Sequence, residues 1–161
     1  MTKKIELTKG KFTLIDDTDY EYLNQWRWYA WKNGNAFYAA RMEGKRPFRK
    51  MILMHREIMK TPNRMVVDHV DMDGLNNTRT NLRNCTSSQN MRNTKVHSNN
   101  SSGYKGVYWD KLVGKWHAQI SIDYKTIYIG IYDTIEDAAR ARDEAAKQYH
   151  GEFAVLNFPK N

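Results

Sequence analysis

VVDHVDMDGLNNTRTNLRNCTSSQNMRN, residues 66–93, is the stretch of this sequence with the most specific pattern. It holds an Asp-His pair followed by three candidate asparagines, namely Asp68, His69, Asn77, Asn81 and Asn90. The apolar residues after Val70 are too few to form a core, so side-chain hydrogen bonds are expected to hold the stretch together. Oxygen atoms of Asp and Asn bind hard divalent cations, and His titrates near neutral pH. The stretch therefore contains the residue types that metal-assisted phosphodiester hydrolysis needs.

The order of these residues places constraints on the site. Successive strand residues point to opposite faces, so Asp68 and His69 must lie at a bend or loop edge to face one phosphate. Residues Ser87–Thr94 are predicted to form a short helix that carries Asn90, with Ser87 or Ser88 as its N-cap. Loops rich in Asn, Asp and Gly are turns more often than sites, so the pattern as a whole, rather than one dipeptide, favours a nuclease.

The same stretch resembles the HNH nucleases, and specifically the HNH homing endonucleases of phage and intron type. The residues that carry the resemblance are Asp68-His69, Asn76-Asn77, Asn81-Leu82-Arg83, Gln89–Asn93 and the upstream Met54–Ile58. The resemblance implies a ββα-metal module, in which a strand pair and a helix hold one metal ion. It also implies double-stranded DNA as the substrate.

Roles follow from the resemblance residue by residue. It implies that His69 is the general base, that Asp68 and Asn90 are metal ligands, and that Asn81 pins the loop and orients the base. Asn90 stands where the family often has a second His, and its amide oxygen can still bind a cation with help from water and phosphate. The expected ion is Mg²⁺, with Mn²⁺ as the alternative. Zinc is not expected, because Cys85 is the single cysteine.

Residues 5–50 have the pattern of short strands. Strands are predicted at Lys11–Ile15, Trp26–Trp31 and Ala36–Met42, with a turn at Asp16-Asp17 and a hairpin turn at Asn33-Gly34-Asn35. The segment is rich in aromatic residues: Trp26, Trp28, Tyr29, Trp31, Phe37 and Tyr38. These could form a platform on which bases stack. Aromatics at strand spacing are more often core residues, and that interpretation is favoured.

Basic residues follow this aromatic segment. They are Arg41, Lys45, Arg46, Arg49 and Lys50. Their proximity to the nuclease motif favours contact with DNA phosphates, and a solvated basic loop is the alternative.

Beyond residue 103 the hydrophobic pattern becomes regular. Strands are predicted at Tyr104–Lys111, Lys115–Asp123 and Lys125–Tyr132, the last two with apolar residues at every second position. Ile127, Ile129 and Ile131 are expected on the buried face of the third strand. A helix is predicted next, with Thr134 as N-cap, Asp137 completing a capping box, and Gly151 as the stop. One helix face collects apolar and small residues: Ile135, Ala138, Ala139, Arg142, Ala145, Ala146 and Tyr149.

This second half resembles the DNA-binding domain of Apetala-two/ethylene-response-factor type. The matching motifs are Y-K-G-V at Tyr104–Val107, G-K-W at Gly114–Trp116, I-G-I-Y at Ile129–Tyr132, D-A-A-R-A at Asp137–Ala141 and A-V-L-N-F-P at Ala154–Pro159. The resemblance implies that the polar face of the sheet lies in the DNA major groove. The candidate DNA-binding residues of this half are Lys105, Tyr108, Asp110, Lys111, Gln119, Ser121, Thr126 and Tyr128. Most of them are neutral, so weak binding by this module alone is expected.

Composition agrees with a nucleic-acid partner. The net charge is +8 and the pI is about 9.5, which favours a polyanion. Residues 1–93 hold 17 Lys and Arg against 10 Asp and Glu, while residues 94–161 hold 9 against 8. The first part therefore supplies most of the electrostatic attraction. The single cysteine suits a reducing cytoplasm, and no long apolar run predicts a signal peptide or membrane span.

These observations combine into one prediction. The fold class is α+β: a β-rich unit leading into the HNH module (residues 1–93, core about 51–93), a linker (94–103), and a three-stranded antiparallel sheet packed on one helix (104–161). The expected function is metal-dependent cleavage of double-stranded DNA by a monomer or weak dimer, phage-encoded and acting in the host cytoplasm. The alternative is a sequence-preferring DNA-binding protein that does not cleave.

Overall fold

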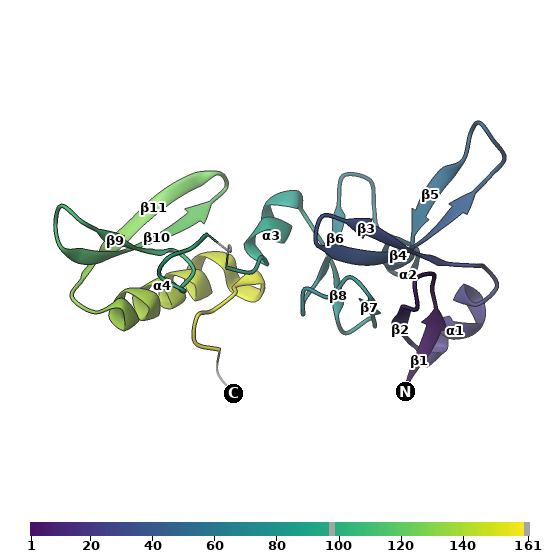
Figure 1. The fold of residues 1–161 in the computed structure, drawn as a ribbon, viewed down its shortest axis with the longest axis horizontal. Helices are drawn as coiled ribbons and strands as arrows, with labels where there is room; N and C mark the ends of the chain where they lie inside the picture. Colours follow the sequence, from purple (N-terminus) through teal and green to yellow (C-terminus); the bar gives the residue numbers. More distant parts are fainter. Residues whose placement is uncertain (97–98, 160–161) are drawn as a thin grey trace. The chain divides into compact units, whose positions relative to one another are not determined.

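The computed structural model describes residues 1–96 and 99–159 and has a mixed α+β fold (Figure 1). The chain forms two compact units, Met1–Ser87 and Ser88–Asn161. A linker was expected at residues 94–103, and the described residues of that segment belong to the second unit. The division between units falls just after the start of helix α3 (Ser87–Arg92). Within the described residues, no helix is long and apolar enough to span a membrane.

The first unit contains short strands and two short helices. Its elements are β1 (Thr2–Glu6), β2 (Phe12–Asp16), α1 (Asp17–Leu23), β3 (Tyr29–Asn33), β4 (Ala36–Glu43), β5 (Lys50–Leu53), α2 (Met54–Met59), β6 (Val66–His69), β7 (Asn76–Asn77) and β8 (Leu82–Cys85). The strands form three small sheets, in the orders β1-β2-β7, β3-β4-β5 and β6-β8. They share one core, whose most buried members are Ile15, Leu23, Ala39 and Met54.

One strand pairing brings the N-terminus to the nuclease motif. Strand β7, inside residues 66–93, pairs in parallel with β2, so that Ile15 lies opposite Asn77. The backbone N–H of Leu14 donates to the carbonyl of Leu75 at 2.9 Å, which extends this contact into the loop. The N-terminal hairpin therefore forms a wall of the candidate site, a role that the sequence pattern did not indicate.

Two local predictions for the first unit had different outcomes. The hairpin turn at Asn33-Gly34-Asn35 is confirmed, because β3 ends at Asn33 and β4 begins at Ala36. The turn predicted at Asp16-Asp17 is instead the start of helix α1. The reason is the amphipathic spacing of Tyr20 and Leu23, since Leu23 is completely buried in the core.

Three of the aromatic residues, Trp26 and Trp28 before β3 and Phe37 on β4, belong to the core or pack against it, as the favoured interpretation expected. Trp28 is only 4% exposed, and its indole N–H donates to the carbonyl of Leu23 at 2.8 Å. Trp26 and Phe37 are partly buried and pack against the same core. Because its N–H has a hydrogen-bond partner, the indole of Trp28 can be buried without leaving a polar group unsatisfied.

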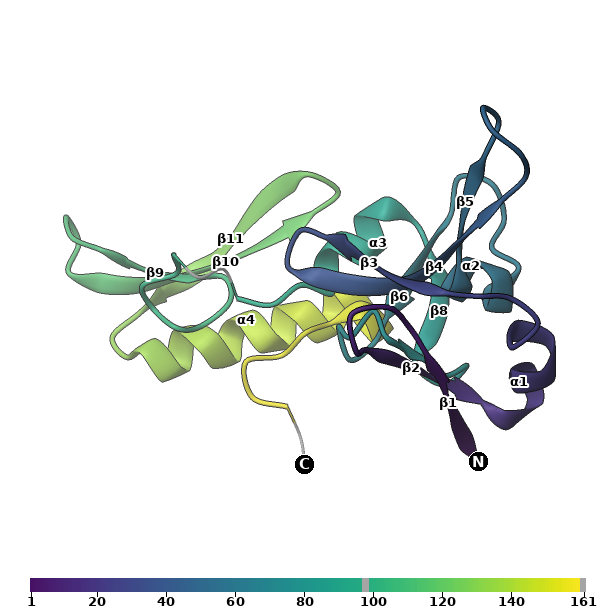
Figure 2. The same ribbon diagram turned by 45° about the vertical axis from the view of Figure 1, so that its right-hand side comes forward.

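The second unit is a three-stranded antiparallel sheet with a helix across one face (Figures 1 and 2). Its elements beyond α3 are β9 (Val107–Asp110), β10 (Lys115–Ile122), β11 (Lys125–Tyr132), α4 (Ile135–His150) and the 3-10 turn η1 (Gly151–Phe153). The small residues of α4 pack against the sheet, as predicted, with Ala139 and Ala146 fully buried. The predicted cap is confirmed, because the Thr134 hydroxyl accepts from the N–H of Asp137 at 3.1 Å. Tyr149 is exposed, and His150 ends the buried helix face instead.

A β-bulge changes which face the residues of β11 occupy. The pairing between β10 and β11 shifts between Ala118 and Gln119, so Ile131 lies opposite His117. The extra residue reverses the alternation on one side of the bulge. Ile131 is therefore exposed, and only Ile129 of the three isoleucines packs against the core. The expectation that all three share the buried face was wrong for Ile131, because a period of two does not reveal a bulge, while Ile127, opposite the buried Ile120, is 38% exposed.

The close packing at Gly106 generates a prediction. Gly103 and Gly106 both have φ of +75°, but a Cβ at Gly106 would lie 2.4 Å from the carbonyl oxygen of Gln119, whereas one at Gly103 meets nothing. Gly106→Ala should destabilise the second unit by more than the ~1 kcal/mol expected from positive φ alone. Hydrogen exchange of the α4 amides in the full chain measures this. Gly103→Ala is the matched control, and equal effects of the two variants would contradict the packing argument.

Candidate active site

His69 lies at the end of β6, where it is paired with Leu82 of β8, and is 6% exposed. Its ring meets that of His55 from helix α2 edge-on, with centroids 5.1 Å apart. The ring of Tyr38 from β4 lies 5.9 Å from His69 and 5.6 Å from His55. Helix α2 and strand β4 therefore each place a ring against the imidazole of His69.

A chain of hydrogen bonds joins His69 to the N-terminal hairpin. The hydroxyl of Thr13 lies 2.7 Å from the carbonyl of Leu75 and donates to it, and the same hydroxyl accepts from the amide nitrogen of Asn77 at 2.8 Å. The amide oxygen of Asn77 lies 3.2 Å from Nε2 of His69. Thr13 and Asn77 are both completely buried. We call this chain the Thr13–Asn77 relay.

The relay determines which nitrogen of His69 carries the proton. The Leu75 carbonyl can only accept, so the Thr13 hydroxyl must donate to it and must accept from the Asn77 NH₂ group. The oxygen of the Asn77 amide then points to His69, and it can only accept. Nε2 must therefore be the protonated nitrogen in the neutral ring, which leaves the lone pair on Nδ1.

The environment keeps this imidazole neutral. Burial lowers the pKa of His69 below its ordinary value of 6.5, while the hydrogen bond with Asn77 and the charge of Asp71 oppose the change. The net direction is downward, so the ring is unprotonated at neutral pH and can accept a proton.

Asn81 organises the loop between β6 and β8. Its amide oxygen accepts from the N–H of Asp71 at 3.0 Å, and its NH₂ group donates to the Asp71 carboxylate and to the carbonyl of Asn76, both at 2.8 Å. Burial alone would raise the pKa of Asp71, but hydrogen bonds from Asp73, Asn76 and Asn81 lower it overall. Asn81 thus holds the loop, while the contact with the imidazole comes from Asn77.

Asp68 and Asn90 are the candidate metal ligands. Asp68 is buried, and its carboxylate accepts from Arg83 at 2.6 and 2.8 Å, which balances its charge in the interior. Asn90 lies on α3, in the second unit. A carboxylate and an amide oxygen are suitable donors for Mg²⁺. Within the described residues, no group of three or more His, Cys, Asp and Glu is close enough to hold a metal.

Two residues predicted to contact DNA, Arg41 and Lys105, have their charged groups bonded inside the protein. Arg41 is buried, with its guanidinium 4.4 Å from the ring of Trp26 and paired with Glu43 at 2.8 Å. The ammonium of Lys105 donates to the carbonyls of Arg92 and Thr94 at 2.8 and 2.7 Å. Both cations are used within their own units. By contrast, Lys45, Arg46 and Arg49 are exposed as expected for phosphate contacts.

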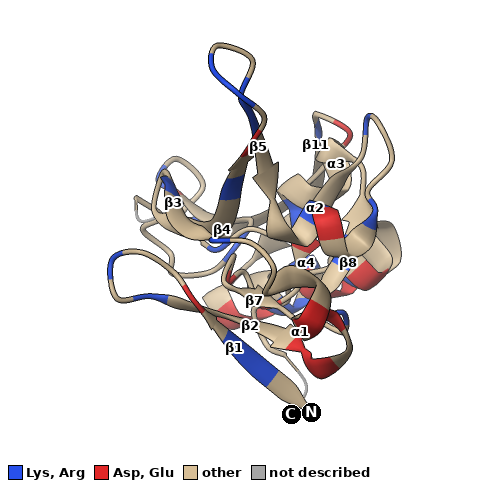
Figure 3. Ribbon diagram, turned by 90° about the vertical axis from the view of Figure 1, so that its right-hand side faces the viewer, with Lys and Arg blue, Asp and Glu red and all other residues tan. Residues whose placement is uncertain are grey.

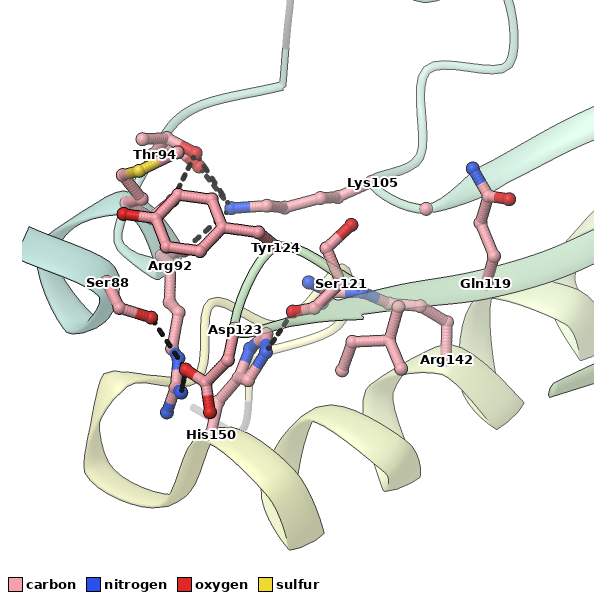
Figure 4. Close-up of a pocket in the computed structure, with 13 residues that line it drawn as sticks. Ser88, Arg92, Thr94, Lys105, Gln119, Ser121, Asp123, Tyr124, Arg142 and His150 are labelled. Atoms are coloured by element: carbon pink, nitrogen blue, oxygen red, sulfur yellow. Dashed lines mark hydrogen bonds and ion pairs between the residues drawn. The ribbon is translucent and has the colours of Figure 1, made fainter. Parts of the chain in front are cut away.

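Lys105 belongs to a cavity of about 360 Å³ in the second unit, between α3 and the end of the sheet (Figure 4). Ser88 and Arg92 of α3 both bond the carboxylate of Asp123, at 2.8 and 3.2 Å. Burial lowers the pKa of Lys105 to about 8, and the nearby charge of Arg142 adds to this effect. These contacts attach the helix that carries Asn90 to the second unit.

The outer face of the second sheet, opposite α4, carries the remaining candidate DNA-binding residues. His117 lies between the rings of Tyr108 and Tyr128, at 5.1 and 5.6 Å between centroids, and Asp110 is 3.3 Å from its Nε2. The predicted contact residues that are exposed are Tyr108, Lys111, Ser121, Thr126 and Tyr128, with Gln119 partly buried. This face is aromatic and polar, with few cations.

Comparison with known proteins finds a different family in each part of the chain. The HNH endonuclease family model matches residues 60–92, and the AP2 domain model matches residues 102–152. An uncharacterized HNH endonuclease of Acanthamoeba polyphaga mimivirus is 30% identical over 150 residues, which are 92% of this chain and 76% of that protein. Protein 3.8 of Escherichia phage T7 is 31% identical over 96 residues, 58% of this chain and 76% of that protein. An AP2-like ethylene-responsive transcription factor of Arabidopsis thaliana is 41% identical over 58 residues, 36% of this chain and 12% of the plant protein.

An HNH match that lies mostly in the first unit and an AP2 match in the second define a class of modular protein for which DNA binding is implied. Within that class, the chain belongs to the HNH endonuclease family. Both resemblances seen in the sequence are thereby confirmed. The plant protein is matched over a small part of its length, so the likeness concerns its AP2 domain alone.

Thr13 and Tyr38 are members of the site that sequence patterns did not reveal. Both belong to strands that come early in the chain, and each precedes His69 by 31 residues or more. Asn77 was a candidate without a role. No local signal marks these residues, because the pairing of β2 with β7 and the packing of β4 bring them to His69.

The burial of His55 leads to a prediction about pH. Desolvation, with the charges of His69 and Arg56 adding to it, lowers the pKa of His55 from 6.5 to about 3. The unfolded chain binds a proton between these values and the folded chain does not, so stability falls as pH drops below 6.5. His55→Phe should make the unfolding free energy less dependent on pH between 6.5 and 4, as measured by urea denaturation. Coincident pH profiles for the variant and the wild type would contradict this account.

Proposed function

We propose that this protein is a metal-dependent endonuclease that hydrolyses phosphodiester bonds of double-stranded DNA, with His69 as general base. The observation that supports it most directly is the Thr13–Asn77 relay, which leaves the lone pair of His69 on Nδ1. A buried imidazole held in one tautomer with a lowered pKa has the properties of a general base at neutral pH.

In the proposed reaction, Nδ1 of His69 removes a proton from a water molecule as the water oxygen attacks phosphorus. The bond between phosphorus and the 3′ oxygen breaks in line with the attack, and the leaving oxygen is protonated from solvent. Asp68 and Asn90 would hold a divalent cation, Mg²⁺ or Mn²⁺, which when bound supplies charge stabilisation for the leaving oxygen. Asn81 keeps the loop around Asp71 in place, and Arg83 keeps the Asp68 carboxylate oriented.

The second unit is proposed to hold the DNA through the outer face of its sheet. Tyr108, Thr126 and Tyr128 are exposed on that face and offer hydroxyl groups. Such groups can bond base edges or phosphates, and a sheet can enter the major groove. Linking this unit to the nuclease raises the local concentration of each at the DNA, so neither unit must bind tightly by itself. One site per chain predicts a nick for each binding event.

The first test is nicking of supercoiled plasmid that carries the native gene flank. Nicking should require Mg²⁺ or Mn²⁺, stop with EDTA, and fall by at least about 100-fold in His69→Ala, the usual contribution of a general base. Asp68→Asn and Asn90→Ala should raise the Mg²⁺ concentration needed for half-maximal rate. Asn63→Ala, an exposed asparagine, is the matched control. Binding without metal-dependent nicking would instead indicate a DNA-binding protein that does not cleave.

The relay provides a second test of the same site. Thr13→Val keeps the shape of the side chain but removes the hydroxyl, so the Asn77 amide is no longer fixed in one orientation. The nicking rate should fall on the order of tenfold, the value of one net hydrogen bond, and Thr13→Ser should restore it. Thr78→Val is the control, because the Thr78 hydroxyl bonds Asn76 outside the relay. If Thr13→Val nicks at the wild-type rate with an unchanged melting temperature, the relay has no part in catalysis.

A further inference from the structure

The loop between β4 and β5, residues 44–49, forms the tip of a hairpin that projects from the first unit (Figures 1 and 2). Its strands are in register, with Glu43 opposite Lys50 and Met42 opposite Met51. Every residue from 42 to 50 is exposed. We call residues 42–51 the β4–β5 arm. No part of the catalysis proposed above uses its tip.

The arm carries a concentrated positive charge. Lys45, Arg46, Arg49 and Lys50 lie within six residues that contain no acidic side chain, and Figure 3 shows Lys and Arg in blue along the projecting hairpin. Within the described part of the chain, none of these four has an ion pair or side-chain hydrogen bond. Their charges are available to a polyanion, and duplex DNA has one phosphate charge for each ~1.7 Å of its axis.

The arm also holds an apolar side chain in water. Phe48 is 89% exposed at the tip, and no aromatic ring or cation stacks on it in the described residues. Met42 on β4 and Met51 on β5 are also exposed and face each other across the hairpin, closer to its base. Moving a side chain of this size out of water gains about 1.5–3 kcal/mol. A basic tip with an unshielded phenyl ring therefore suits a partner that offers both phosphates and an apolar gap.

We propose that the β4–β5 arm enters the minor groove of duplex DNA and that Phe48 inserts between two base pairs. The four cations would contact phosphates on both sides of the groove, while the phenyl ring replaces base stacking at the opened step. Apolar wedges of this kind unstack one step and bend the duplex. This inference rests on DNA being the substrate, as proposed above, and adds a second mode of recognition to it.

The insertion has a consequence for target choice. Pyrimidine–purine steps open more easily than others, so the arm should favour such a step. Selection of this kind reads the deformability of DNA without hydrogen bonds to bases. It would compensate for the few cations on the outer face of the second sheet.

The experiment uses native-flank duplexes with 2-aminopurine at successive positions and the full chain carrying His69→Ala, so that DNA is not cut. Unstacking should raise the fluorescence at one step. Phe48→Ala should abolish that rise and weaken binding on the order of tenfold, since one stacking interaction has about that value. Phe48→Leu should keep the rise. Phe12→Ala removes an exposed ring on β2 and should change neither signal.

Salt dependence separates the two parts of the arm. Replacing Lys45, Arg46, Arg49 and Lys50 with Gln should reduce the slope of log affinity against log salt, by about 0.9 for each phosphate that the arm no longer neutralises. Phe48→Ala should leave this slope unchanged, because Phe carries no charge. The inference would be overturned if the His69→Ala chain binds tightly with a flat fluorescence profile and Phe48→Ala has no effect. Nicking by the chain with His69 intact would then leave the nuclease proposal standing. Phe48-dependent binding to anionic lipid vesicles, with DNA binding independent of Phe48, would also overturn the inference.

Discussion

The candidate site depends on the two hydrogen bonds of the buried Asn77 amide. Its NH₂ group donates to the hydroxyl of Thr13 in the N-terminal hairpin, and its oxygen contacts the imidazole of His69. Because Asn77 is completely buried, an amide turned the wrong way would place its oxygen against the Thr13 oxygen, and two acceptors facing each other cost about 1–3 kcal/mol. The fold of the first unit and the protonation state of its candidate base are therefore set by the same contacts.

The candidate base His69 and the candidate ligand Asn90 belong to different units. The base and its relay lie in the first unit, while Asn90 lies on a helix that Asp123 and Lys105 attach to the second. Hydrogen bonds inside the second unit therefore position the helix that carries Asn90, whereas contacts inside the first unit position His69.

Sequence patterns predicted the features that depend on local chemistry. The Thr134 cap, the hairpin at Asn33–Asn35 and the antiparallel sheet of the second unit follow from spacing and turn residues. Features that depend on contacts between distant segments were not predictable. Arg41 was interpreted as a surface cation, but packing places it over Trp26. The bulge that exposes Ile131 and the parallel pairing that brings Thr13 to Asn77 are of the same kind.

The central claim is that the Thr13–Asn77 relay holds His69 as the tautomer protonated at Nε2. Long-range ¹H–¹⁵N correlation spectra of the imidazole at pH 7, in the full metal-free chain, measure this directly, with His69→Gln to assign the signals. We expect a protonated Nε2 and an unprotonated Nδ1 in the wild type, and averaging of the two nitrogens in Thr13→Val. A wild-type ring protonated at Nδ1, or one that exchanges freely between tautomers, would contradict the account.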